Sequence, residues 1–241
     1  MVKFIELNQV DSTNNYATAL AHAGMAQHGT CVFAHHQTNG KGQRNKEWIA
    51  QQNQNITCSI ILEPTCLNSS EMFWLSKAVA LGGCRFLKKY INENVTIKWP
   101  NDLYWCDRKA GGILIENIIQ GSQWKFAICG IGINVNQVVF DDLQTKAVSL
   151  KQITGIHYQP ISLAQELATD VLNAFDALIS NHFFTEMEYK KSLYKWKQKV
   201  RLKKANRVFE AIILDVTSAG QLVVKHAIQE QFNVGQIEWI I

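Results

Sequence analysis

Residues 95–136, VTIKWPNDLYWCDRKAGGILIENIIQGSQWKFAICGIGINVN, decide the fold. They contain four short runs rich in apolar and β-branched residues, at 95–99, 103–106, 112–119 and 124–136. The turn sequences Pro-Asn-Asp, Asp-Arg-Lys and Gly-Ser separate these runs. Strands joined by such turns pair with their neighbours in sequence. The stretch therefore predicts a β-meander.

Helical and strand patterns flank the meander on both sides. Asp11-Ser12-Thr13 is expected to cap a helix that runs to about residue 24, since side-chain oxygens there satisfy free backbone N–H groups. Strands are predicted at 31–35 and 56–62, and a long helix from Ser69 or Ser70, again with a serine cap. Ser162 to Gln165 has the form of a capping box before an apolar stripe. We expect that helix to cover one face of the sheet.

The last part of the chain returns to strand patterns, at 199–203, 208–216, 221–225 and 236–240. The turn Thr217-Ser-Ala-Gly220 joins two of them. This tail predicts a barrel-like unit of about 45 residues, too small to carry much chemistry alone. The expected fold is therefore α+β, with a sheet and packed helices in residues 1–196 and a small β-barrel in residues 197–241.

Composition and charge limit the classes of function. With 241 residues, 47% of them hydrophobic, the chain can bury one substantial core. Its net charge of +4 is too small for a nucleic-acid coating and suits an acidic partner or a phosphate-bearing ligand better. The six cysteines lie far apart, which predicts that most are buried thiols and that they form no metal site. Neither a signal peptide nor an apolar span is evident, so we expect a cytoplasmic protein with no membrane contact.

The segment Gly40-Lys-Gly-Gln-Arg-Asn-Lys-Glu-Trp48 concentrates glycines and three cations between two predicted strands. Glycines let backbone N–H groups converge on phosphate oxygens, and Lys41, Arg44 and Lys46 could neutralise charge during nucleotidyl transfer. The segment matches no P-loop or dinucleotide fingerprint. A solvated basic turn is the alternative interpretation.

Two further segments place polar groups at strand ends. In Lys98-Trp-Pro-Asn-Asp102, proline stops a strand and leaves an amide and a carboxylate together, although an ordinary turn has the same pattern. Lys109 precedes Ala-Gly-Gly112 and could place an ammonium against a carboxylate or phosphate. The alternative is a solvent-facing turn lysine.

In Gly130-Ile-Gly-Ile-Asn-Val-Asn136, strand alternation puts the apolar residues on one face and the glycines and asparagines on the other. Two glycines within a strand indicate that something packs hard against the backbone. That object is either another part of the chain or a planar ligand such as adenine. The glycine face is thus predicted to be a flat floor.

Weaker candidates favour structural interpretations. His35 and His36 have no third ligand at metal spacing, and Glu116 is interpreted as a pocket-rim or sheet-edge carboxylate. Basic residues alternate with other residues from Lys195 to Lys203, as on one strand face. A solvated face is the first interpretation of this run, and docking of an acidic carrier is the second.

Taken in order, five blocks resemble the signature series of the biotin–protein ligase family: Asp11-Ser-Thr-Asn14, Gln37-x-x-Gly-Lys-Gly42, Lys98-Trp-Pro-Asn-Asp-Leu-Tyr104, Lys109-Ala-Gly-Gly112 and Gly130-Ile-Gly-Ile-Asn134. The end of the chain, Phe232-Asn-Val-Gly-Gln-Ile237, is similar to the family's small SH3-like domain. The resemblance implies the class II synthetase-like biotin–lipoate ligase fold, in which the larger sheet is mixed. It also implies a two-step reaction with ATP and Mg²⁺, in which biotin is the substrate and biotinyl-adenylate the intermediate.

The resemblance assigns roles to residues of this chain. Biotin would be bound by Ser12, Thr13, Asn14, Gln37, Gly40, Lys41, Gly42, Gln43, Lys109 and Gly112. ATP would be bound by Lys98, Trp99, Asn101, Asp102, Gly130 and Asn134. Lys109, Lys41, Arg44 and Asp102 would be catalytic: Lys109 would hold the carboxylate and phosphate, and the loop would fold over the adenylate. Beyond the resemblance, we expect Asp102 to help orient or deprotonate the incoming lysine.

Two positions depart from the family's pattern. Lys41 stands where arginine is usual, and lysine lacks the bidentate fork of a guanidinium. Asn45 stands where a third glycine is frequent, and asparagine adopts left-handed backbone less freely than glycine. We expect catalysis to survive, with the consequence falling on adenylate retention.

The expected partner is a biotin carboxyl carrier protein, with the enzyme a monomer or homodimer. The first block starts at Asp11, which leaves no room for a winged helix-turn-helix before it, so we expect no DNA binding and no repressor function. Alternatives are a lipoate or octanoate ligase or transferase, against which the Gln37 and Lys-Trp-Pro-Asn-Asp blocks argue, and a non-catalytic biotin- or carrier-binding protein.

Overall fold

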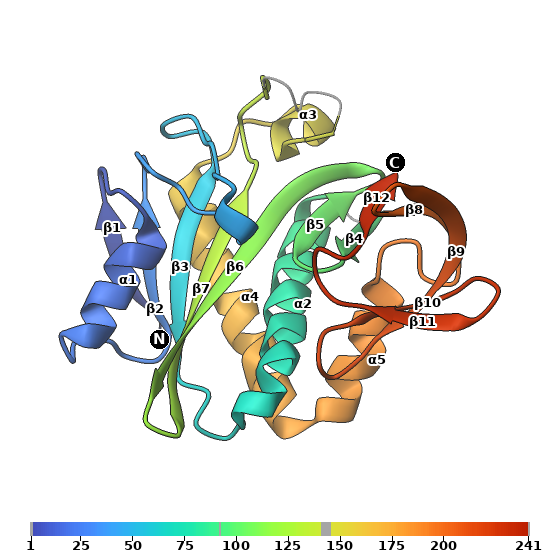
Figure 1. Cartoon of the computed structure of the whole chain (residues 1–241). Helices are drawn as coiled ribbons and strands as arrows, with labels where there is room; N and C mark the ends of the chain where they lie inside the picture. Colours follow the sequence, from blue (N-terminus) through green and yellow to red (C-terminus); the bar gives the residue numbers. More distant parts are fainter. Residues whose placement is uncertain (1, 92, 141–145, 241) are drawn as a thin grey trace.

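The computed structural model describes residues 2–91, 93–140 and 146–240, and the described residues form two β-sheets with five α-helices (Figure 1). The larger sheet has the order β1-β2-β3-β7-β6-β5-β4. β1 and β2 run parallel, whereas the other neighbours pair antiparallel. Its strands are β1 (Lys3–Leu7), β2 (Thr30–Ala34), β3 (Ile56–Leu62), β4 (Val95–Lys98), β5 (Asp102–Trp105), β6 (Arg108–Gln120) and β7 (Gln123–Ile133). The mixed sheet is confirmed, and the predicted meander is β4 to β7.

Strand alternation divides the apolar residues of this sheet between two cores. Ile60 of β3 belongs to the larger core, with α2 (Met72–Ile91) and α4 (Pro160–Ser180) packed on that face. Ile61, the next residue, belongs to a smaller core beneath α1 (Thr13–His22) on the opposite face. Figure 1 shows α2 and α4 side by side behind the strands and α1 apart from them. Beyond the reach of α1, this second face is open for a ligand site.

Helix starts differ from the expected caps at three places. Ser12 is the N-cap residue of α1, but its side chain makes no capping hydrogen bond. The 3-10 turn η2 (Ser69–Glu71) leads into α2, and its N-cap residue is Asn68, not a serine. The capping box predicted at Ser162 is wrong, because α4 already begins at Pro160. Proline suits the first helical turn, where its missing N–H costs no hydrogen bond.

Three elements of the larger unit were not predicted: β1, the short α3 (Leu150–Thr154) and α5 (His182–Ser192). α3 starts with a true capping box, in which Ser149 accepts from the Gln152 backbone. The apolar side chains of α5 do not form one buried stripe, and Phe183 is 74% exposed. A helix without a buried stripe gives little periodic signal.

The C-terminal sheet has the order β11-β10-β9-β8-β12 and is antiparallel throughout. Its strands are β8 (Lys199–Lys204), β9 (Arg207–Val216), β10 (Leu222–Lys225), β11 (Gln229–Phe232) and β12 (Glu238–Ile240). This arrangement agrees with the SH3-like unit expected. The polar β11 was not predicted. Apolar side chains of this sheet join the larger core, so the two sheets share continuous packing.

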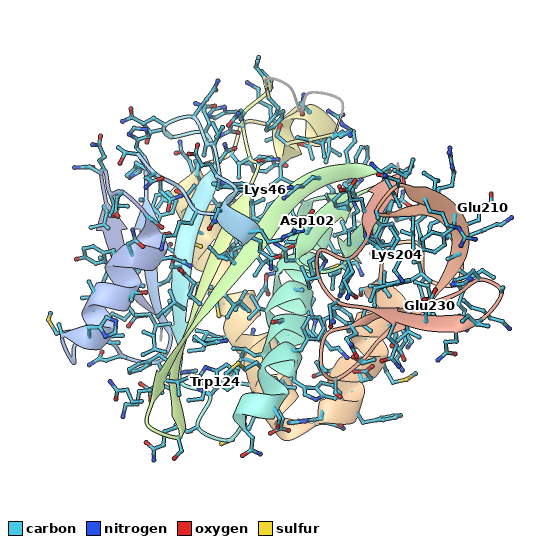
Figure 2. All side chains as sticks on the ribbon, viewed as in Figure 1. Lys46, Asp102, Trp124, Lys204, Glu210 and Glu230 are labelled. Atoms are coloured by element: carbon cyan, nitrogen blue, oxygen red, sulfur yellow. The ribbon has the colours of Figure 1, made fainter. Side chains whose placement is uncertain are left out.

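The basic run is only partly a strand face. Lys195 and Lys197 have left-handed backbone, with φ of 56° and 58°, and β8 begins after them. Within the sheet, Lys199 pairs with Glu210 at 2.5 Å. Lys204, which follows the run, pairs with Glu230 at 3.5 Å (Figure 2). These neighbouring carboxylates offset the positive charge, which favours the solvated-face interpretation.

The six cysteines are free thiols: Cys31, Cys58, Cys84 and Cys129 are buried, whereas Cys66 and Cys106 are exposed. Among the described residues, no helix is long and apolar enough to cross a membrane.

Candidate functional site

The predicted glycine floor lies on the α1 face of the large sheet. A Cβ atom at Gly130 would lie 2.3 Å from Oδ1 of Asn14, and one at Gly132 would lie 2.2 Å from the indole of Trp48. These distances leave no room for a larger residue. Two side chains of the same chain, Asn14 and Trp48, therefore pack on the floor. The sequence left open whether the object packed there is part of the chain or a planar ligand, and the structure shows that it is part of the chain. A cavity of about 480 Å³ opens beside them, a size typical of small-molecule sites.

A chain of hydrogen bonds forms one end of this cavity. The Thr13 hydroxyl donates to Oε1 of Gln37 at 3.0 Å, and the Thr13 backbone N–H donates to the same oxygen at 2.8 Å. The Ser59 hydroxyl lies 2.7 Å from the Thr13 oxygen and 2.6 Å from Oδ1 of Asn14. Nδ2 of Asn14 donates to Glu116 at 2.7 Å. We call these five residues the polar relay.

The polar relay orients its amide groups. Because Oδ1 of Asn14 faces a hydroxyl and Nδ2 faces a carboxylate, the amide has one orientation. Ser59 is completely buried and was not predicted as part of the site. Its signal was present in the sequence, as a polar residue among the apolar residues of β3. On a strand, its position alternates with the core residues and so faces α1.

The glycine-rich loop covers the cavity. The N–H of Gly42 donates to the carbonyl of Lys46 at 2.7 Å, and the N–H of Trp48 donates to the carbonyl of Gly40 at 2.9 Å. Arg44 lies in the short 3-10 turn η1 (Gln43–Asn45). Lys41 reaches back to Glu116 at 3.4 Å, which ties the loop to the polar relay.

Gly40 is not among the residues that line the cavity, and its predicted role at the biotin site stays a prediction. A Cβ there would lie 2.3 Å from the carbonyl oxygen of Trp48. Gly40 is therefore required for the close approach of the two loop ends.

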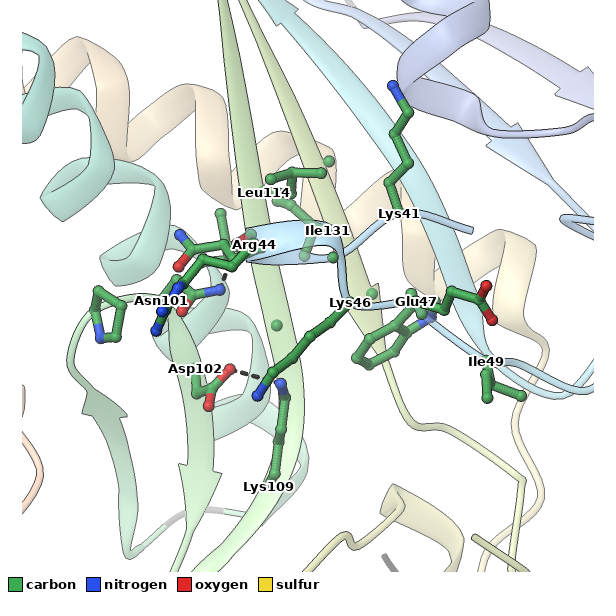
Figure 3. A pocket seen from close by; sticks show the side chains of 18 of the residues that line it. Lys41, Arg44, Lys46, Glu47, Ile49, Asn101, Asp102, Lys109, Leu114 and Ile131 are labelled. Carbon is green, nitrogen blue, oxygen red and sulfur yellow. Dashed lines mark hydrogen bonds and ion pairs between the residues drawn. The ribbon is translucent and has the colours of Figure 1, made fainter. Parts of the chain in front are cut away.

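The opposite end of the cavity is rich in cations. Nζ of Lys109 lies 2.6 Å from Oδ1 of Asp102, so Lys109 is not the unpartnered turn lysine of the alternative interpretation. The backbone N–H of Lys109 donates to the carbonyl of Lys146 at 2.7 Å. Figure 3 shows Lys46 reaching from the loop toward the Asp102–Lys109 pair. Several ammonium groups thus converge beside one carboxylate, which favours an anionic ligand.

Lys98 is not among the residues that line the cavity, and its predicted contact with ATP stays a prediction. Its ammonium donates to the Tyr104 hydroxyl at 3.0 Å and lies 5.6 Å from the ring centre of Trp239. Burial lowers the pKa of Lys98 to about 8, because the charged form loses its hydration.

Three predicted nucleotide-binding side chains border the cavity with donors already used inside the protein. The indole N–H of Trp99 donates to the carbonyl of Gly220 at 2.9 Å. Nδ2 of Asn101 donates to the carbonyl of Ile113 at 2.8 Å, and Nδ2 of Asn134 donates to that of Val148 at 3.2 Å. These bonds hold the strand ends together. The indole of Trp99 therefore has no donor left for a ligand, whereas Nδ2 of Asn101 has a second N–H.

The structure brings most of the predicted site residues together around one cavity. Those that line it are Ser12, Thr13, Asn14, Gln37, Lys41, Gly42, Gln43, Arg44, Trp99, Asn101, Asp102, Lys109, Gly112, Gly130 and Asn134. The C-terminal sheet contributes residues that were not predicted: Val234, Gly235, Ile237 and Trp239. The tail therefore takes part in the site. No local pattern marks these residues, since only folding brings them to the loop.

The described residues contain no group of three or more His, Cys, Asp or Glu side chains that could hold a metal ion. Among the residues that the structure describes, the acidic ones that line the cavity are Glu47 and Asp102, and Asp102 already pairs with Lys109. A cage for Mg²⁺ made of protein ligands therefore does not fit this part of the chain.

Comparison with known sequences gives a consistent set of relatives. The model of the biotin/lipoate A/B protein ligase family matches residues 6–134, more than half of the chain. The bifunctional ligase/repressor BirA of Bacillus subtilis is 35% identical over 150 residues, covering 61% of this chain and 45% of that protein. The biotin–[acetyl-CoA-carboxylase] ligase of Mycobacterium tuberculosis is 30% identical over 145 residues, covering 59% and 52%. The chain spans about half the length of the curated relatives it matches.

Solved structures show the same fold along nearly the whole chain. The biotin protein ligase from Aquifex aeolicus in complex with biotin and ATP superposes with a TM-score of 0.80 at 21% identity, covering 99% of this chain and 98% of that one. The biotin protein ligase from Leishmania major in complex with biotinyl-5-AMP gives a TM-score of 0.65 at 23% identity, covering 96% and 99%.

Proposed function

This chain belongs to the biotin/lipoate A/B protein ligase family, and on that premise we propose that it uses ATP to attach biotin to a specific lysine of a biotin carboxyl carrier protein. The observation that carries the proposal is that the two ends of one cavity differ in chemistry. The polar relay offers oriented hydrogen-bonding groups at one end, and the Lys109–Asp102 pair stands among cations at the other. A cyclic urea with a carboxylate tail has matching chemistry at its two ends.

The proposed reaction has two steps. The biotin carboxylate attacks the α-phosphorus of ATP, so that a carbon–oxygen–phosphorus linkage forms and pyrophosphate leaves. The Nζ atom of the carrier lysine then attacks the acyl carbon of biotinyl-5'-adenylate. An amide bond forms, AMP leaves, and the lysine loses its proton.

The first step brings two anions together, and residues at the cationic end would offset their repulsion. Lys109 would bridge the biotin carboxylate and the α-phosphate. Its ammonium already binds one carboxylate, because it lies 2.6 Å from Oδ1 of Asp102. Arg44 and Lys41 would close the loop over the adenylate. Asp102 would accept a hydrogen bond from the incoming lysine once Lys109 turns to the substrate.

At the other end, Thr13, Asn14 and Gln37 would hold the ureido ring with Ser12. Ser59 and Glu116 would keep the relay side chains in one orientation. Mg²⁺ would arrive with the phosphates of ATP. The carrier as partner agrees with the names of the relatives, which are ligases for acetyl-CoA carboxylase.

The test is exchange of labelled pyrophosphate into ATP in the presence of biotin, lipoate or octanoate. We expect exchange with biotin alone. Exchange with lipoate or octanoate would instead support the lipoate-type alternative, and folded protein without exchange would support a non-catalytic binding protein. Mass spectrometry of a carrier domain after incubation with biotin and Mg-ATP would test the second step, with a mass gain of one biotin expected.

A further inference from the structure

A turn of the C-terminal sheet lies against the glycine-rich loop. The turn has a fixed shape: the backbone N–H of Asn233 donates to the Gln236 side chain at 2.7 Å, and the N–H of Gln236 returns a bond to the Asn233 carbonyl at 3.1 Å. Gly235, inside this turn, has a φ of +87°. A Cβ there would lie 2.7 Å from Cζ of Arg44. The guanidinium therefore rests on a backbone that has no side chain.

The loop adopts a conformation that needs support. Arg44 and Asn45 both have left-handed backbone, with φ of 57° and 60°, and neither is glycine. Such residues persist only where surrounding contacts determine the conformation. Inside the loop, backbone hydrogen bonds close its two ends. Outside it, the contact on Gly235 holds the side chain of the first left-handed residue.

The C-terminal sheet is itself a firm support. The buried indole of Trp99 donates to the carbonyl of Gly220 at 2.9 Å. The fully buried Lys77 of α2 donates to the carbonyl of Val216 at 3.1 Å. Both bonds join the sheet to the large unit through backbone atoms. The turn is therefore fixed relative to the large sheet, and it gives the loop a rigid surface to pack on.

We propose that Gly235 is a positioning residue that acts through Arg44 and holds the glycine-rich loop closed over the cavity. Lys41 ties the other side of the loop to Glu116, so the loop is held from both sides. If the proposed function holds, the same contact sets how long the acyl-adenylate stays bound. The positional role itself does not depend on that function.

The test compares Gly235→Ala with Gly121→Ala by amide hydrogen exchange of the unliganded full chain. Gly121 is a matched control, because it also has a positive φ, of +60°, but a Cβ there meets nothing within 4 Å. We expect the amides of Gly42, Lys46 and Trp48 to exchange about tenfold faster or more in Gly235→Ala, because the added methyl displaces Arg44. The control should leave these amides unchanged.

Equal exchange in both variants would overturn the proposal. Arg44→Ala tests the same contact from the exposed loop, and it remains informative if Gly235→Ala does not fold. It should raise exchange at the same amides, and Gly235→Ala should add nothing further in that background. An additive effect would mean that Gly235 acts by another route.

A second measurement follows the dissociation of biotinyl-adenylate, which we expect to be faster in Gly235→Ala than in Gly121→Ala. If the wild-type protein does not exchange pyrophosphate into ATP, the proposed function is contradicted. The amide hydrogen-exchange rates of the loop would still decide the role of Gly235. Wild-type activity combined with unchanged loop amides would overturn the positional role alone.

Discussion

Replacement of Lys109 by alanine separates two roles of one ammonium. The side chains of Lys109 and Asp102 are 34% and 22% exposed, and the pair is 2.6 Å long. Ion pairs with this solvent access contribute about 1 kcal/mol or less to stability. Loss of the pair should therefore lower the melting temperature by only about 2–4 °C in a protein of this size.

Catalysis should suffer much more. Removal of one donor that stabilises a transition-state charge lowers the rate by about a hundredfold or more. We expect that loss in single-turnover formation of biotinyl-adenylate by Lys109→Ala, at saturating biotin and ATP. Lys199→Ala is the control, since it removes a 2.5 Å ion pair with Glu210 on the C-terminal sheet. It should leave the rate unchanged.

The double variant Lys109→Ala/Asp102→Ala removes the carboxylate that the single variant leaves unpaired. It should be destabilised by less than the sum of the two single changes, because the two groups interact directly. Its adenylation rate should stay low. A near-native adenylation rate in Lys109→Ala at near-native melting temperature would refute the proposed role of this lysine.

Three further predictions concern residues around the cavity. Ser59→Ala should cost about 1–3 kcal/mol in thermal or urea unfolding and raise the KM for biotin, because buried relay partners lose a hydrogen bond; an unchanged KM would remove Ser59 from the site. Gly132→Ala should displace the Trp48 indole, since its Cβ would lie 2.2 Å from that ring, and should thereby lower the adenylation rate. A near-native adenylation rate, or an equal loss of rate in Gly121→Ala, would count against this. Burial lowers the pKa of Lys98 to about 8 from its usual 10.5, so the unfolded chain binds more protons between these values. Urea unfolding should then show wild-type stability rising relative to Lys98→Met by roughly 1–3 kcal/mol from pH 8 to 10.5, and parallel curves would contradict the assignment.

Local patterns in the sequence were sufficient for strands β2 to β7 of the large sheet and for the floor of the site, but not for β1. The meander β4 to β7 follows from apolar runs between turn residues, and the glycine face of β7 follows from a period of two. These features depend on residues close together in the chain. The helix start at Pro160 was missed, because the local pattern from Ser162 to Gln165 also has the form of a cap.

By itself, then, the sequence determined the antiparallel meander, the glycine floor and the order of the motifs that surround the cavity. Only the tertiary structure decided which donors are already used, as in Trp99 and Asn134, and which charges pair, as in Lys109 with Asp102. It alone placed Gly235 against Arg44. The reason is physical: periodicity and turn chemistry act between neighbouring residues, whereas a contact between distant segments depends on how the whole core packs.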